Sequence, residues 1–208
     1  MIKSFCNETR HAQNLMSLDD LIDLANQGNT IYDPFSLLIS KNIIIGTGNI
    51  FFPNVTLICS PAGNISLKNR NIFFPNAFLN AGTGSIIIGS HNSFGEGGFT
   101  AKTEQADTQI TIGNYARFQN NCTLYGPVSI GDGAQVLGPI QVMNCTLEAG
   151  GSFQEEDVDK RAGVLKGTGR ARNLTVPMGH VILGNGTFNQ NALEKQSAYH
   201  PKIKKEIG

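Results

Sequence analysis

Four histidines and a group of basic residues have the clearest potential for chemistry in this sequence of 208 residues. An imidazole titrates near neutral pH, so an accessible histidine can accept a proton from a hydroxyl or an amine. His91 stands in the glycine-rich segment IGSHNSFGEGG, and Glu96 follows it in the same segment. His91 is therefore a candidate general base, and Glu96 is a candidate either for orienting its imidazole or for binding an acceptor. The alternative is an exposed histidine without a role beside a solvated carboxylate.

The basic residues gather in the segment 154–173, QEEDVDKRAGVLKGTGRARN. Guanidinium and ammonium groups bind phosphate, and the glycines of this segment let backbone amides approach an anion. We predict that Lys166, Arg170 and Arg172 bind the phosphates of a ligand. The alternative is that these cations, among acidic neighbours, only keep an exposed loop soluble.

A repeat of six residues indicates the scaffold that positions these side chains. From Ile112 onward the hexads read IGNYAR, FQNNCT, LYGPVS, IGDGAQ, VLGPIQ and VMNCTL. The first position is large and apolar and the fifth is mostly small, which suits short strands joined by tight bends. Three such strands close a triangular coil in which both positions face inward. Gly113 and Gly131 at the second position suit corners, where the backbone needs freedom.

The same register extends through most of the chain and stacks like residues in columns. Asn49, Asn71 and Asn92 form an asparagine stack of the kind that parallel strands favour. The apolar columns are Ile45, Leu67, Ile88, Ile112, Ile130 and Leu147 in the first, Phe51, Phe73, Phe94, Phe118, Val136 and Phe153 in the second, and Leu57, Leu79, Leu124 and Val142 in the third. These columns predict a prism of about six to seven coils, which at a spacing of about 4.8 Å is roughly 30 Å long.

This pattern resembles the hexapeptide-repeat family over roughly residues 43–188. The resemblance implies an all-β fold, the left-handed parallel β-helix. Its handedness is implied by the resemblance alone, because general connection rules favour right-handed crossovers.

The resemblance also implies a function. Many members of the family are acyltransferases that use an acyl-CoA or an acyl-carrier protein and work as homotrimers, with active sites between adjacent prisms. A histidine on a coil surface then deprotonates the hydroxyl or amine of a small-molecule acceptor, which is the role implied for His91. Acyl-CoA would be the co-substrate, contacted by Lys166, Arg170 and Arg172, and no cofactor would be permanently bound.

Interruptions of the repeat predict three parts of the chain. Residues 1–42 form an N-terminal segment with a capping helix, residues 43–188 form the β-helix, and residues 189–208 form a C-terminal cap and tail. Loop insertions are expected at 97–109, where the loop would shape the acceptor pocket, and at 154–173. A β-helix exposes strand edges at both ends, so terminal caps are needed.

The capping helix is predicted within SLDDLIDLANQG. Ser17 is its N-cap, Asp20 takes the capping-box position, and Gly28 ends it. Among the other histidines, His180 falls at an inward position and favours a half-buried, hydrogen-bonded side chain. His11 and His200 lie outside the repeat and are not expected to take part in the reaction.

Two other functional classes are compatible with this fold. One is a non-catalytic trimeric scaffold or assembly subunit, because a fold does not fix a function. The other is a zinc carbonic-anhydrase-like enzyme, which needs three converging histidines. RFQNN at 117–121 has Asn120 where the signature of that class has aspartate, and closely spaced histidines are missing from the middle coils.

Composition bears on partners and location. Sixteen acidic and sixteen basic residues give no argument for nucleic acid or an anionic membrane as a partner. No apolar run approaches a transmembrane length, and the first residues lack the apolar core of a signal peptide. We therefore expect no membrane insertion and a cytoplasmic location, with the four cysteines reduced.

Overall fold

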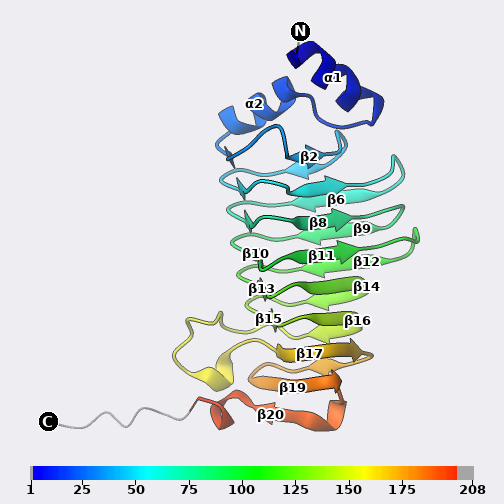
Figure 1. Ribbon diagram of the computed structural model, residues 1–208. Helices are drawn as coiled ribbons and strands as arrows, with labels where there is room; N and C mark the ends of the chain where they lie inside the picture. The colour runs from blue at the N-terminus through cyan, green and yellow to red at the C-terminus, as the bar shows by residue number, and fades with distance from the viewer. Residues whose placement is uncertain (1, 201–208) are drawn as a thin grey trace, which may run out of the picture.

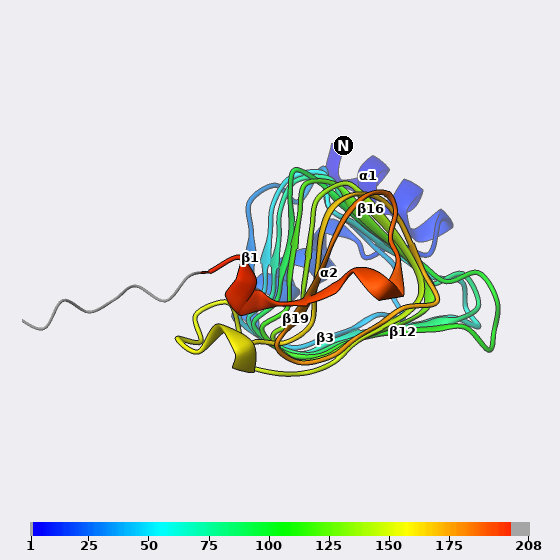
Figure 2. The ribbon, with the colours of Figure 1, turned by 90° about the horizontal axis from the view of Figure 1, so that it is seen from below.

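The structure, a computed structural model, describes residues 2–200, so the predicted tail at 201–208 lies outside the described residues. Parallel strands form a three-sided column below a pair of N-terminal helices (Figure 1). Each strand pairs with the strand one coil later, as β4 (Ile50–Phe51) pairs with β7 (Ile72–Phe73). Seen from the C-terminal end, the chain turns clockwise as it approaches the viewer, so the coil is left-handed (Figure 2). The predicted left-handed parallel β-helix is confirmed.

Three parallel sheets form the sides of the column. Sheet A contains β1 (Thr30–Ile31), β4, β7, β10 (Ser93–Glu96), β13 (Arg117–Gln119), β15 (Gln135–Leu137) and the first parts of β17 (Val164–Arg172) and β19 (His180–Thr187). Sheet B contains β2 (Leu38–Ile39), β5 (Thr56–Ile58), β8 (Ala77–Asn80), β11 (Phe99–Lys102), the first parts of β14 (Cys122–Ile130) and β16 (Ile140–Leu147), and the last parts of β17 and β19. Sheet C contains β3 (Ile44–Ile45), β6 (Asn64–Leu67), β9 (Ser85–Ile88), β12 (Gln109–Ile112), the last parts of β14 and β16, and β18 (Thr175–Val176).

The predicted phenylalanine column fills the centre of the prism. Phe51, Phe73, Phe94 and Phe118 are fully buried. Their stacked rings have centroids 5.3, 4.7 and 5.2 Å apart in chain order. At this spacing, a pair of aromatic rings stabilises the fold by more than the burial of its surface area alone.

The asparagine stack is confirmed, and it begins one coil earlier than the sequence pattern suggests. The Oδ1 atom of Asn29 accepts hydrogen bonds from the backbone N–H and the Nδ2 of Asn49, at 2.9 and 3.1 Å. The same pair of contacts joins Asn49 to Asn71 and Asn71 to Asn92. All four side chains are buried, so each amide is satisfied by its neighbours in place of water.

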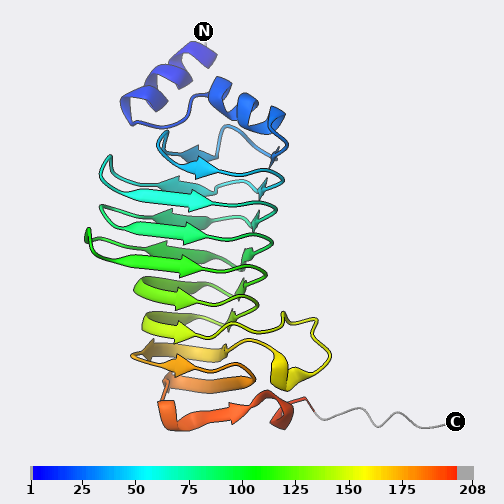
Figure 3. The same ribbon diagram turned by 180° about the vertical axis from the view of Figure 1, so that it is seen from behind.

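The last rung of the phenylalanine column was predicted wrongly. Phe153 is 43% exposed, and Leu165 takes the rung below Val136. The chain leaves the prism near residue 151, and Figure 3 shows this excursion beside the column. It is back in the prism at β17, so the second half of the predicted loop 154–173 is a strand. The excursion begins before Phe153, so the six-residue count no longer applies at that residue.

The predicted loop 97–109 is also partly a strand. β11 occupies residues 99–102 and pairs with β8, which leaves an insertion at 103–108. Phe99 and Ala101 both face inward, but the large and the small residue have exchanged the order that other hexads show. The ring of Phe99 instead packs against Phe94 and Phe118, at centroid distances of 5.0 and 4.8 Å.

The N-terminal boundary of the β-helix also needs a correction. The first coil begins at Thr30, which pairs with Ile50, and not near residue 43. Above it lie α1 (Ile2–Ala12), which the sequence pattern did not indicate, and α2 (Leu18–Asn26). Within residues 2–200, no helix is long and apolar enough to cross a membrane.

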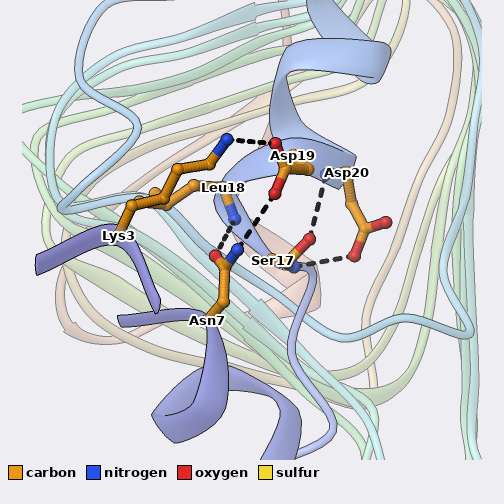
Figure 4. A network of polar contacts seen from close by, with 6 residues as sticks. All are labelled: Lys3, Asn7, Ser17, Leu18, Asp19 and Asp20. Carbon is orange, nitrogen blue, oxygen red and sulfur yellow. Dashed lines mark hydrogen bonds and ion pairs between the residues drawn. The ribbon is translucent and has the colours of Figure 1, made fainter. Parts of the chain in front are cut away.

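The predicted capping box of α2 is present (Figure 4). The Asp20 backbone N–H donates to the Ser17 hydroxyl at 3.1 Å, and the Ser17 backbone N–H donates to the Asp20 carboxylate at 2.7 Å. This last hydrogen bond lowers the pKa of Asp20, so the box is complete at neutral pH. Asn7 joins the two helices, since its side chain accepts from the Leu18 N–H and donates to Asp19.

The opposite end of the prism carries a different cover. β20 (Leu193–Lys195) pairs antiparallel with β19. It thereby covers the strand edge that β19 would otherwise expose at the end of the prism. Short 3₁₀ turns flank β20 at Gln190–Ala192 and Gln196–Ala198. The segment predicted as a C-terminal cap therefore covers a strand edge, as this fold requires.

A buried arginine fastens α1 to the first coil. The guanidinium of Arg10 donates to the carbonyl oxygens of Met16, Pro34, Phe35 and Leu37 at 2.9–3.2 Å. Hydrogen bonds from charged groups contribute about 1.5–3 kcal/mol each. Removing the guanidinium leaves these carbonyl oxygens without a hydrogen-bond donor, which destabilises the docked helix.

We expect Arg10→Met to speed hydrogen exchange in α1 and α2 by about a hundredfold, because roughly 3 kcal/mol of docking energy is lost. The control is Lys3→Met, which removes an exposed ion pair to Asp19 and is expected to change exchange little. Equal exchange rates in the two variants would contradict this role of Arg10.

Candidate functional site

A cavity of about 320 Å³ lies on the outer face of sheet A, over the last coils. Its floor follows from strand alternation, because residues on either side of an inward residue face outward. Val164 and Lys166 flank the buried Leu165, and Val181 and Leu183 flank the buried Ile182 in the same way. The floor is therefore mainly aliphatic, with one ammonium group at its edge.

The excursion and the C-terminal segment provide the walls of this cavity. A 3₁₀ turn at Val158–Lys160 folds the excursion back, and the Ser197 N–H donates to the Asp159 carboxylate at 3.0 Å. Gln196 is buried, and its Nε2 donates to the Ala162 carbonyl at 2.8 Å. These contacts bring two segments that are far apart in the sequence to the same side of sheet A.

Three basic side chains line the cavity: Arg117, Arg161 and Lys166. The guanidinium of Arg117 lies over the ring of Phe153, 4.9 Å from its centroid, which explains why that exposed ring stays against the prism. The Nε of Arg161 donates to the Glu155 carbonyl at 2.8 Å. Within residues 2–200, neither Arg161 nor Lys166 forms an ion pair, so both charges are available to an anion.

Tyr199 and His200 complete the wall on the C-terminal side. The Tyr199 hydroxyl donates to the Glu194 carboxylate at 2.7 Å, and this hydrogen bond raises the pKa of the tyrosine, which stays protonated at neutral pH. The cavity therefore combines an apolar floor with cationic and neutral polar walls.

His91 lies at the corner between β9 and β10, in the left-handed backbone region with φ 62°. Its exposed ring stacks on Tyr115 of the next coil, with centroids 4.7 Å apart and planes inclined by 9°. His91 therefore lies on the coil surface, where the role implied for it requires a histidine.

Glu96 lies at the other end of β10, and the structure does not bring it to His91. Its carboxylate accepts a hydrogen bond from the Gln119 side chain and lies 3.8 Å from the Arg117 guanidinium. The hypothesis that Glu96 orients the His91 imidazole therefore fails within one chain, whereas its role towards an acceptor stays a prediction.

The three predicted phosphate-binding residues divide between two faces. Lys166 lines the cavity on sheet A, but Arg170 and Arg172 flank the inward Ala171 on the outer face of sheet B. Of these three residues, a single ligand in the cavity meets Lys166 only, and binding by Arg170 and Arg172 would need a separate site on sheet B. Arg117 was not among the predicted residues, because nothing in its hexad distinguishes it from a solvated outward residue.

The remaining candidates can be placed as well. His180 is half-buried, and its Nδ1 lies 2.9 Å from the Met178 carbonyl, in line with the structural role predicted for it. The thiol of Cys122 is buried, which raises its pKa to about 12, so it stays protonated and is not a nucleophile at neutral pH. Residues 2–200 contain no group of three or more His, Cys, Asp or Glu side chains that could hold a metal ion.

The chain is similar to several solved structures. No family model and no curated protein sequence matches this chain. Among solved structures, that of LpxA from Acinetobacter baumannii is similar, with 16% identity over 85% of this chain and 77% of that chain, and a TM-score of 0.28. The chain has the fold of the hexapeptide-repeat proteins. The three parallel sheets and the left-handed coil are the features of the molecule that define this fold.

Proposed function

We propose that the protein is an acyltransferase that moves an acyl group from a CoA-type donor to a hydroxyl or amine of a small-molecule acceptor. The observation that carries the proposal is the cavity on sheet A, where two unpaired cations border an aliphatic floor. A CoA-type donor has matching parts. Its phosphates suit Arg161 and Lys166, and its pantetheine arm suits Val181 and Leu183.

In the proposed reaction His91 is the general base. Its imidazole accepts the proton of the acceptor group while the oxygen or nitrogen attacks the thioester carbonyl. The tetrahedral intermediate then expels the thiolate of the donor, which takes the proton from the His91 imidazolium, so the base is regenerated and no acyl-enzyme is formed. Glu96 would accept a hydrogen bond from the acceptor.

This assignment requires more than one copy of the chain. His91 lies on the corner beside sheet A, and it does not line the cavity of its own chain. We therefore propose a homotrimer in which His91 faces the cavity of a neighbouring subunit. We also propose a cytoplasmic location, where reduced thiols and CoA donors occur together.

The test is release of free thiol from acetyl-CoA in the presence of a panel of sugars, amines and amino acids. We expect turnover that depends on the acceptor, and a rate at least about a hundredfold lower for His91→Asn. His11→Asn, an exposed histidine on α1, is the control and should keep the full rate. An unchanged rate for His91→Asn would remove His91 from the mechanism.

A non-catalytic trimeric scaffold is the second candidate. The observation that favours it is the His91 side chain, which stacks on the ring of Tyr115 but makes no hydrogen bond or ion pair within residues 2–200 that would prepare it as a base. Under this alternative the mass in solution is that of a trimer, but acetyl-CoA stays intact with every acceptor. The thiol assay therefore separates the two candidates.

A further inference from the structure

A second stack of aromatic rings runs down the outside of the prism, where sheet A meets sheet B. It consists of Tyr32, Phe52 and Phe74, with centroids 4.8 and 5.2 Å apart. The strand register sets the positions of these rings, because each aromatic residue directly follows an inward residue of the sheet A column. In the next coil Phe94 pairs with Phe73, so the residue that should continue the outer stack is Gly95.

A glycine-rich turn stands in place of the next ring, and a hollow lies between the turn and Phe74. The backbone bulges between Phe94 and Glu96 and turns sharply, with the Gly98 N–H donating to the Gly95 carbonyl at 2.8 Å. The two glycines have φ of 100° and 86°, a region that other residues rarely adopt. In the turn Gly95–Gly98 only Glu96 has a side chain, and the resulting open hollow measures about 490 Å³.

Polar groups surround the exposed face of Phe74. Asn76 and Asn121 line the hollow from the coils above and below, and both have left-handed backbones, with φ of 65° and 61°. Their side-chain amides make no hydrogen bond within residues 2–200. Glu96 is held at the same rim by Gln119 and Arg117, so its position is fixed while part of its carboxylate remains open.

We propose that this hollow binds a pyranose sugar. The site shares Glu96 with the acceptor contact proposed above, but sugar binding is measured without a donor, so it can fail or succeed separately from acyl transfer. The sugar ring lies in the hollow beside the turn Gly95–Gly98 and lays its C–H face on Phe74, at the spacing of about 5 Å that aromatic stacking prefers. Its hydroxyls donate to the Glu96 carboxylate and exchange hydrogen bonds with the amides of Asn76 and Asn121. An anionic ligand is disfavoured, because the one guanidinium near the rim, Arg117, already faces Glu96.

The test is a titration of the ¹⁵N-labelled protein with methyl glycosides of glucose, galactose and N-acetylglucosamine. We expect at least one of them to shift the amide signals of Gly95, Gly97 and Gly98 in a saturable way. Phe74→Leu removes the platform and should weaken that binding about tenfold or more. Phe52→Leu is the matched control, because it makes the same substitution one rung higher in the stack and should leave the affinity within about twofold.

Three outcomes would overturn the proposal. One is that no glycoside shifts these glycine signals. Another is that Phe52→Leu weakens binding as much as Phe74→Leu, which would mean that the stack acts through stability alone. The third is that indole displaces the glycoside at equal concentration, which would assign the hollow to flat aromatic rings. The glycine signals of each free variant report whether the turn has kept its fold.

Discussion

Replacing Asn71 by alanine is expected to lower the free energy of unfolding by roughly 3 kcal/mol. Its side chain is fully buried, and its Oδ1 accepts two hydrogen bonds from Asn92, each at 3.0 Å. Its Nδ2 donates to Asn49 at 3.1 Å and to the Gly89 carbonyl at 2.9 Å. Alanine leaves these buried groups without partners at a depth that water cannot reach. Each such group then costs its desolvation free energy, which exceeds the net contribution of an ordinary hydrogen bond.

Urea unfolding measures this effect, with Asn69→Ala as the control. Asn69 is exposed at the corner of the same coil, where its Oδ1 accepts one hydrogen bond from the Thr47 N–H at 2.9 Å. Water can replace that contact, so the control should lose less than about 1 kcal/mol. If both variants lost the same amount, the asparagine stack would not be the specific support that the contacts indicate.

Removing the ammonium group of Lys166 is expected to weaken binding of CoA by about tenfold to a hundredfold. A hydrogen bond between a charged group and a phosphate contributes about 1.5–3 kcal/mol, and 1.4 kcal/mol corresponds to a factor of ten. Isothermal titration of Lys166→Met with CoA gives the dissociation constant directly. Higher ionic strength should weaken binding by the wild type more than by the variant, because salt screens the lost attraction.

The matched control for this prediction is Arg172→Met. Arg172 lies on the same strand, β17, and is also an exposed cation, but it is on the outer face of sheet B. We expect its removal to leave the affinity for CoA within about twofold. If Arg172→Met weakens binding and Lys166→Met does not, the donor binds to sheet B, and the cavity is not its site.

Much of the fold follows from the sequence because each inward residue repeats the environment of the residue one coil earlier. A column such as Phe51, Phe73 and Phe94 shows in the spacing alone, and so does the asparagine stack. The prediction failed where the six-residue spacing no longer indicates which residue is buried. Leu165 follows an excursion of arbitrary length, and Phe99 exchanges the usual order of large and small residues.

The candidate site was less predictable for a related reason. A corner position such as His91 follows from the hexad, because corners recur with the repeat. The cavity, in contrast, needs residues from the fifth coil, the excursion and the C-terminal segment, as Arg117, Arg161 and Tyr199 show. Nothing periodic links these segments, since the contacts of Gln196 and Ser197 bring them together only in the folded chain.

A crystal structure of the protein with CoA tests the central claim most directly. The account predicts density for CoA on sheet A, with phosphate oxygens within hydrogen-bond distance of Arg161 and Lys166 and the pantetheine arm over Leu183. Density for CoA along Arg170 and Arg172, or an empty cavity in crystals grown at a CoA concentration that saturates binding in solution, would contradict it.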